Sequence, residues 1–168
     1  PIFNADKEVA KIYKNDRSCY KKIKKVLPKY IISDHLDKKF LLKAVLDSKN
    51  NLKKISKIVH PIVRTRMNKF LTNNKTKKLV VLDIPLYLEN KLNKKGDVLI
   101  FIDAKQKDIQ KRLKNRKYFS EKVHKKLKSL HLPLRKKRKL SNFVINNTFN
   151  ASKKQNDVKK INTKILKI

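Results

Sequence analysis

The chain has 168 residues, of which 39% are hydrophobic and 36% are charged, and its formal net charge at pH 7 is +34. This length and composition predict one globular domain with a substantial core. A single cysteine excludes a disulfide framework and a cysteine-based zinc site. No apolar run approaches the ~20 residues of a membrane span, and no secretory signal is visible, so we expect a cytoplasmic protein without membrane contact.

The positive charge consists mainly of lysine, which supplies 40 of the 47 cationic residues. A net charge of this size normally suggests a nucleic-acid-binding protein. Here the lysines are spread along the whole chain, and abundant Lys, Asn and Ile share AT-rich codons, so a biased genome explains the pattern. Dispersed charge supports only non-specific, salt-sensitive binding. We therefore expect no specific nucleic-acid partner, although an anionic substrate would still be attracted.

The first residues predict a strand that ends near residue 3 and a helix over 4–16. Val9, Ile12 and Tyr13 fall on one face of that helix. Asp6 lies at the strand-to-helix turn. From the residues alone, Asp6 is an N-cap or a first-turn carboxylate stabilised by the helix dipole.

Residues 17–27 predict a lysine-rich helix that is broken at Pro28. Two amphipathic helices are expected at about 36–47 and 50–59. A further helix is expected to begin at His60–Pro61, because proline suits the first turn of a helix. His60 then either caps and packs or contacts a ligand. Metal binding is not expected, since the four histidines lack ligand spacing.

Two apolar runs, 79–82 and 98–102, are rich in β-branched residues and end at Asp83 and Asp103. Neither run alternates with polar residues, which is typical of strands in a buried parallel sheet. A short, polar, helix-like stretch separates the runs. Ligands of open α/β sheets bind beyond the carboxyl ends of the strands. Asp83, Pro85 and Glu89 therefore lie where chemistry is expected.

The remaining residues predict a helix over 105–116, with Ile109 and Leu113 inward, and a helix that opens at Ser120 as its N-cap. Arg112 and Arg116 share one face of the first of these helices. They either contact a ligand or form a solvated basic face. A last strand is expected at 143–145, followed by Asn147. A final amphipathic helix is expected within 150–168, with three apolar residues inward: Val158, Ile161 and Ile165.

The stretches "LDIPLYLEN" (82–90), "VLIFIDA" (98–104) and "QKRLKNR" (110–116) resemble the dephospho-coenzyme A kinase family. The similarity extends through residues 3–13, 53–67 and 131–147, so it covers nearly the whole chain in family order. It implies a three-layer α/β/α domain of the phosphate-loop NTPase type, with a parallel sheet. It also implies ATP-dependent phosphorylation of the ribose 3′-hydroxyl of dephospho-CoA, the last step of coenzyme A synthesis.

The resemblance implies a role for several of these residues. Asp6 matches the second aspartate of the family's "DAD" motif, which makes it the general base, whereas Asn4 replaces the first. Asp83 would support Mg²⁺, directly or through water, because an acidic residue that ends a central strand often does so in phosphate-loop enzymes. Glu89 belongs to the same D-x-P-L-x-x-E pattern, and the resemblance implies that Asp83 and Glu89 also contact the substrate. His60 and Arg64 would contact the phosphate or pantetheine portion of the substrate.

The family also suggests the residues that contact ATP, with Arg112 and Arg116 on a helix that leads into a mobile lid. Lys137 and Asn147 match the family segment that ends in the last strand, and Asn147 would meet the adenine or simply turn the chain. Two departures from the family pattern are Lys38 in place of arginine, which loses the bidentate fork, and His131 in place of glutamine.

The chain has one glycine, Gly96, so it contains no glycine-rich phosphate loop. In the resembled family a strand, a GxxxxGK[ST] loop and a helix precede the "DAD" motif. We therefore expect residues 1–168 to be a single kinase domain that starts after this unit and is inactive alone. A helical substrate subdomain is expected at about 17–74 and a lid at about 116–134. We expect a monomer that acts on ATP and dephospho-CoA.

Two alternatives remain open. The first is another nucleoside or nucleotide kinase of the same architecture. The second is a non-catalytic, basic RNA-binding protein. Only 7% of the residues are aromatic and no aromatic cluster accompanies the charge, which disfavours a surface for stacking bases.

Overall fold

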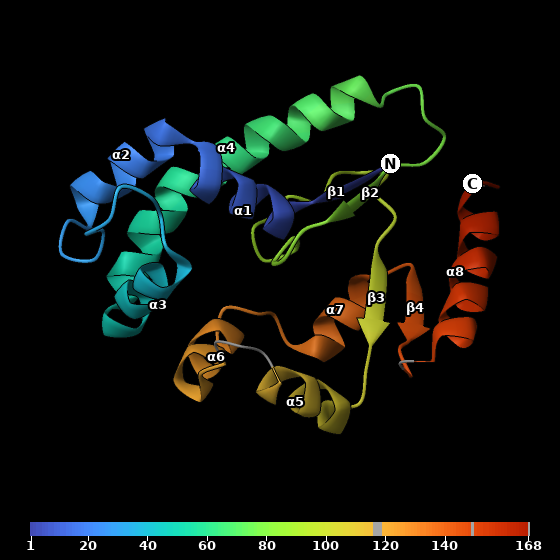
Figure 1. Ribbon diagram of the computed structural model, residues 1–168. Coiled ribbons are helices and arrows are strands. Elements are labelled where there is room, and N and C mark those ends of the chain that lie inside the picture. Colours follow the sequence, from blue (N-terminus) through green and yellow to red (C-terminus); the bar gives the residue numbers. More distant parts are fainter. Residues whose placement is uncertain (116–118, 149, 168) are drawn as a thin grey trace. The chain divides into compact units, whose positions relative to one another are not determined.

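The computed structural model describes residues 1–115, 119–148 and 150–167, without the side chains at 123, 126 and 153 (Figure 1). The chain divides into two compact units, Pro1–Pro85 and Leu86–Ile168. Each unit contains one pair of parallel strands with helices in the connection between them. Among the described residues, no helix has the length and apolar character needed to cross a membrane.

In the first unit, β1 (Ile2–Asn4) pairs in parallel with β2 (Val81–Asp83). The register places Phe3 opposite Leu82 and Asn4 opposite Asp83. The sequence predicted that the second strand begins at residue 79, two residues too early. The register accounts for the difference, because it pairs Ile2 with Val81 and leaves residues 79 and 80 without a partner in β1.

The helices between these strands each begin directly after a residue whose side chain accepts a hydrogen bond from the first turn. These cap residues are Asn4, Asp16, Asp37 and Ser48. Asp6 is therefore not the N-cap of its helix, which was one of the two structural roles considered from the sequence. The helices are α1 (Ala5–Asn15), α2 (Arg17–Val26), α3 (Lys38–Asp47) and α4 (Lys49–Asn73).

The core of the first unit forms where these helices pack together. Ile12 is fully buried, and Val9 and Tyr13 pack against the same cluster, so the predicted inner face of the first helix is confirmed. Burial raises the pKa of the Tyr13 hydroxyl to about 12. The main cluster of buried side chains comprises Ile12, Cys19, Tyr20, Ile23, Leu27, Ile31, Leu36, Leu41, Ala44, Ile55 and Val59.

Helix α4 runs without interruption through His60 and Pro61, so the predicted helix start at His60–Pro61 is wrong. Proline inside a helix costs about 3 kcal/mol because it removes one hydrogen bond and crowds the preceding turn. Burial on both sides of the proline offsets this cost. Val59 lies in the main core cluster, and Met67 lies in a second cluster with Phe3. Each such burial contributes roughly 1.5–3 kcal/mol.

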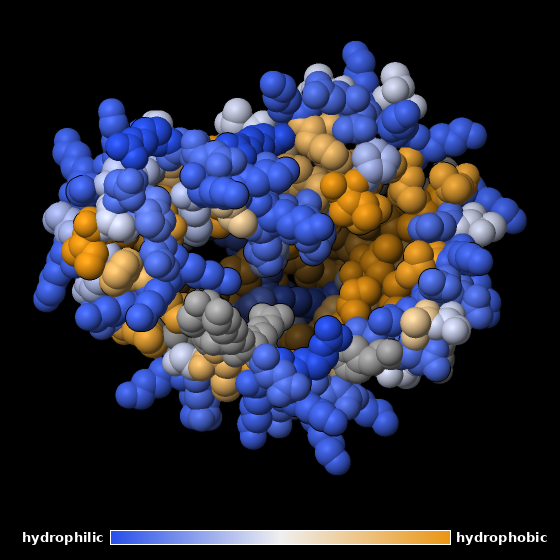
Figure 2. Space-filling view, in the orientation of Figure 1, coloured by the Kyte–Doolittle hydropathy of each residue, from blue (hydrophilic) through white to orange (hydrophobic). Residues whose placement is uncertain are grey.

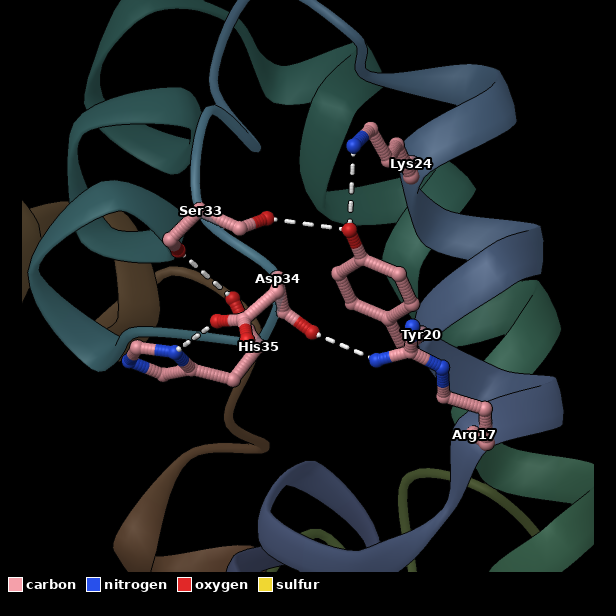
Figure 3. A network of polar contacts seen from close by, with 6 residues as sticks. All are labelled: Arg17, Tyr20, Lys24, Ser33, Asp34 and His35. Carbon is pink, nitrogen blue, oxygen red and sulfur yellow. Dashed lines mark hydrogen bonds and ion pairs between the residues drawn. The ribbon is translucent and has the colours of Figure 1, made fainter.

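The loop between α2 and α3 is held against α2 by polar contacts around Tyr20 (Figure 3). The Tyr20 hydroxyl donates to the Ser33 carbonyl at 2.9 Å and accepts from Lys24 Nζ at 3.0 Å. The Arg17 guanidinium lies 4.9 Å from the centre of the Tyr20 ring and donates to the Asp34 carbonyl at 2.9 Å. These contacts fix the path of a loop that has no regular structure of its own.

In the second unit, β3 (Ile100–Asp103) pairs in parallel with β4 (Phe143–Asn146). Both predicted strands are confirmed, with starts or ends that differ by one or two residues. The helices are α5 (Gln106–Lys114), α6 (Glu121–Lys128), α7 (Leu134–Leu140) and α8 (Ala151–Ile165). α6 begins directly after Ser120, as expected.

Two local predictions in the second unit are wrong. The stretch between the two apolar runs forms successive turns, because Leu86 (φ 57°) and Lys91 (φ 51°) have left-handed backbone conformations that a helix does not allow. Val158 on α8 is 43% exposed, whereas Ile161 is buried and Ile165 is half-buried. The apolar face of α8 is therefore narrower than the sequence pattern suggested.

Hydrophilic side chains are spread over the visible surfaces of both units (Figure 2). This distribution agrees with the dispersal of lysine along the sequence.

Candidate active site

Asn4 and Asp83 lie side by side at the carboxyl ends of the two parallel strands of the first unit. Asn4 Nδ2 donates a hydrogen bond to Asp83 Oδ2 at 2.5 Å. The carbonyl oxygen of the same side chain accepts from the Lys7 backbone N–H at 2.8 Å, which caps α1. One amide therefore fixes both the start of α1 and the orientation of the Asp83 carboxylate.

Asp6 lies in the first turn of α1, two residues after Asn4, and its side chain is exposed. A carboxylate at this position is favourable for the helix dipole. The contacts of the described residues give Asp6 no hydrogen-bond or ion-pair partner. Its carboxylate is consequently available to accept a proton, which is a requirement for a general base.

Helix α4 carries His60 and Arg64, which line one hollow of about 440 Å³ that is open to solvent. Partial desolvation lowers the pKa of His60, and the nearby Arg64 charge lowers it further. His60 is therefore mainly neutral at pH 7. The other residues that line this hollow are Lys53, Ser56, Lys57 and Pro61.

The two lysines of the hollow are residues that sequence reasoning missed. Lys53, Lys57, His60 and Arg64 follow one another at intervals of four, three and four positions, which places them on one helical face. This signal was present in the sequence. We did not interpret this spacing as one helical face because we expected a new helix to begin at His60–Pro61, which would have divided the face between two helices.

In the second unit, Glu89 is the centre of an ionic cluster. Its carboxylate lies 2.6 Å from Lys137 Nζ and 3.6 Å from His131 Nδ1, and it accepts from the Leu132 backbone N–H at 2.9 Å. Its side chain is only 10% exposed. Burial alone would raise its pKa, but hydrogen bonds from Lys137 and Leu132 outweigh this effect and hold the pKa of Glu89 below its ordinary value.

His131 takes part in the same cluster. Lys137 Nζ donates to its Nδ1 at 2.9 Å, which assigns an acceptor role to that nitrogen. Desolvation and the Lys137 charge lower the pKa of His131, against the opposing effect of Glu89. The histidine that stands where the family has glutamine is thus a neutral hydrogen-bond acceptor near pH 7.

The other predicted ATP contacts are distributed along the second unit. Asn147 follows β4, and its backbone N–H donates to the Asp103 carbonyl at 2.6 Å. Arg112 lies in the last turn of α5 and is exposed. Arg116 lies outside the described residues. Within the described residues, no three His, Cys, Asp or Glu side chains gather closely enough to hold a metal ion by themselves.

Comparisons with known proteins agree on one family. The family model for dephospho-CoA kinase matches residues 1–153. The dephospho-CoA kinase of Wolbachia sp. subsp. Brugia malayi (strain TRS) is 32% identical over 162 residues, which cover 95% of this chain and 83% of that protein. The dephospho-CoA kinase of Wolbachia pipientis wMel is 32% identical over 146 residues, which cover 86% of this chain and 74% of that protein.

Two solved structures are similar to this chain. TT1252 from Thermus thermophilus has a TM-score of 0.78 at 23% identity and covers 97% of this chain and 83% of that one. The dephospho-CoA kinase from Campylobacter jejuni has a TM-score of 0.61 at 21% identity and covers 96% of this chain and 83% of that one. These similarities confirm the predicted α/β fold with parallel strands.

Proposed function

Because the chain belongs to the dephospho-CoA kinase family, we propose that the full-length protein transfers the γ-phosphoryl group of ATP to the ribose 3′-hydroxyl of dephospho-CoA. The observation that carries this proposal is the family match over residues 1–153. The geometry at the strand ends supports it, since Asp83, Asn4 and the start of α1 lie where open α/β sheets bind their ligands.

Asp6 is the proposed general base. It is exposed and unpaired among the described contacts, and it follows the capped start of α1, which fixes the backbone that carries it. Its role is to take the proton of the 3′-hydroxyl as that oxygen attacks the γ-phosphorus. Most of the remaining catalytic effect in phosphoryl transfer comes from positioning and from stabilisation of charge.

Asp83 is the proposed protein contact of Mg²⁺, directly or through water. The residues fit this ion, because Mg²⁺ is often held by one or two carboxylates together with substrate phosphates and water. Asn4 occupies one carboxylate oxygen of Asp83 by hydrogen bonding and leaves the other for the ion or its water. When bound, Mg²⁺ would neutralise charge on the ATP phosphates.

His60 and Arg64 are the proposed contacts of the acceptor substrate, and the open hollow on α4 supports this role. We assign the ATP side to Arg112, Arg116, Lys137 and Asn147. The ionic cluster suggests that Glu89 acts through its neighbours, because its carboxylate is already engaged by Lys137 and Leu132. Glu89 would thus hold the 131–137 segment in place without touching a substrate.

We also propose that the enzyme works as a cytoplasmic monomer, where ATP is available and the buried thiol of Cys19 stays reduced. Burial raises the pKa of that thiol to about 11, so it is unreactive at neutral pH.

A substrate panel tests the proposed function. The full-length protein, as its gene encodes it, is incubated with γ-labelled ATP and Mg²⁺ and with dephospho-CoA, adenosine, AMP or CMP as the acceptor. We expect label only in coenzyme A, at the 3′-position. Efficient labelling of a nucleoside or nucleotide without labelling of dephospho-CoA would favour another kinase of the same fold.

A further inference from the structure

The exposed face of α4 carries the residues of one continuous hollow. An α-helix rises about 1.5 Å per residue, so the eleven steps from Lys53 to Arg64 extend roughly 16 Å along the helix. Long lysine and arginine side chains can converge within that length on a group of a few ångströms. The hollow is therefore built from one rigid element of the first unit.

The positive charge of this face is not neutralised by the protein. α4 contains no Asp or Glu, and Lys53, Lys57 and Arg64 form no ion pair among the described residues. Arg66 on the same helix is different, since its guanidinium lies 3.2 Å from Glu8 and 3.9 Å from Asp16. The chain thus pairs the arginine that packs against α1 and leaves the cations of the hollow available for an external anion.

The hollow also offers neutral hydrogen-bonding groups. Pro61 has no N–H, so the Lys57 carbonyl lacks its usual donor within the helix. Ser56 contributes a hydroxyl, and the lowered pKa of His60 keeps its imidazole mainly neutral at pH 7. A ligand that combines anionic oxygens with polar N–H or O–H donors would satisfy both kinds of group.

From these features, and resting on the proposed function, we propose that Lys53, Lys57 and Arg64 bind the diphosphate of dephospho-CoA. The Lys57 carbonyl, Ser56 and neutral His60 then meet the polar start of its pantetheine arm. The volume of about 440 Å³ lies in the range of small-molecule sites, roughly 300–1,000 Å³. No aromatic side chain lines the hollow, so it gives nucleic-acid bases no stacking surface.

Calorimetric titration of the full-length protein with dephospho-CoA tests this proposal. The test variants are Lys53→Gln and Lys57→Gln. The matched controls are Lys54→Gln and Lys69→Gln, which remove the same charge from exposed positions of the same helix outside the hollow. We expect each test variant to weaken dephospho-CoA binding about tenfold, as expected for the loss of a charge-assisted contact, and each control to change it by less than about twofold.

Two further ligands identify the bound group. Pantetheine lacks the diphosphate, so its binding should be the same in the wild type and in the test variants. A single-stranded RNA oligonucleotide should bind test and control variants alike, because it senses only net charge. Unchanged melting temperatures would show that the lysine substitutions leave the fold intact.

The outcomes separate this inference from the proposed function. If the Lys53 and Lys57 variants bind dephospho-CoA as tightly as the controls while the protein still phosphorylates it, the diphosphate site is wrong and the proposed function stands. A selective loss of RNA binding in the test variants, without a change for dephospho-CoA, would also overturn the inference. If the wild type neither binds nor phosphorylates dephospho-CoA, the proposed function fails and the inference fails with it.

Discussion

Asn4 and Asp83 are 79 positions apart in the sequence, yet a hydrogen bond of 2.5 Å joins their side chains at the ends of neighbouring parallel strands. The family pattern has an aspartate at the position of Asn4. An amide there donates to the Asp83 carboxylate, whereas a carboxylate would repel it. The same amide caps α1, so this one residue joins the helix that carries Asp6 to the proposed metal-binding carboxylate.

Asn4→Asp should make stability depend on Mg²⁺. Aspartate keeps the cap, since Asn and Asp cap about equally well. It also brings a second carboxylate against Asp83, so two negative charges repel each other at neutral pH. We expect a lower Tm than wild type at neutral pH and recovery when millimolar Mg²⁺ is added. A Tm equal to wild type with and without Mg²⁺ would contradict the observed geometry.

Glu89→Gln should remove part of the acid sensitivity of the protein. The folded-state pKa of Glu89 is lowered, so its contribution to stability is present above its ordinary pKa of 4.5 and is lost as the pH falls through the lower folded value. We expect the variant to lose about 1–3 kcal/mol near pH 7, because a half-buried Lys137 loses its partner. The difference from wild type should shrink below about pH 4.

Denaturant unfolding across this pH range measures the effect. Glu121→Gln is the matched control, because Glu121 pairs with Lys125 on the surface of α6, where both side chains are more than two-thirds exposed. Glu121→Gln should lower the free energy of unfolding by no more than about 0.5 kcal/mol. If both variants lose the same free energy of unfolding at every pH, the Glu89 cluster stabilises the fold no more than a surface ion pair does.

His60 should affect stability and substrate binding in opposite directions as the pH falls. Its folded-state pKa lies below its ordinary value of 6.5, so the fold favours the neutral ring and loses stability as the pH drops below that value. Protonation adds a positive charge beside Arg64, Lys53 and Lys57, so dephospho-CoA should bind more tightly. Titration at about pH 7.5 and 5.5 compares wild type with His60→Gln. A pH dependence of binding that is unchanged in His60→Gln would contradict this role.

The 168 residues should show no kinase turnover by themselves. One glycine leaves the chain without a glycine-rich loop, and such a loop supplies the backbone N–H groups that cradle the β- and γ-phosphates. Conversion of ATP and dephospho-CoA by purified residues 1–168 is compared with a heat-denatured sample. Activity above that background would show that another part of the chain binds the phosphates.

Much of the fold follows from the sequence because local patterns determined it. The strands of the described residues lie at the predicted segments, with small differences at their ends, and Asp16, Asp37 and Ser48 precede their helices as capping chemistry requires. The continuity of α4 was not predictable in this way. The burial of Val59 and Met67 in separate clusters overrides the local preference of proline for a helix start, and only tertiary packing reveals it.

The candidate site was predicted less completely than the fold. Asp83 was placed from the end of its strand and Asp6 from the family resemblance, but the pairing of Asn4 with Asp83 depends on the register between distant strands, which one sequence does not provide. The contacts of Glu89 with Lys137 and Leu132 likewise join segments 43 or more positions apart. The turns at Leu86 and Lys91 were missed because neither residue is a glycine or asparagine, the usual signals of a left-handed backbone.

The most direct test of the account is the rate of phosphoryl transfer to dephospho-CoA by Asp6→Asn, in a form of the protein that carries a phosphate loop ahead of Pro1. Asn4 is the cap of α1, so the substitution leaves the cap intact and removes only the basic carboxylate. We predict that kcat falls roughly 10²–10⁴-fold, the usual contribution of general acid–base catalysis, while the KM for dephospho-CoA and the Tm change little. A kcat close to that of the wild type would contradict the assignment of Asp6 as the general base.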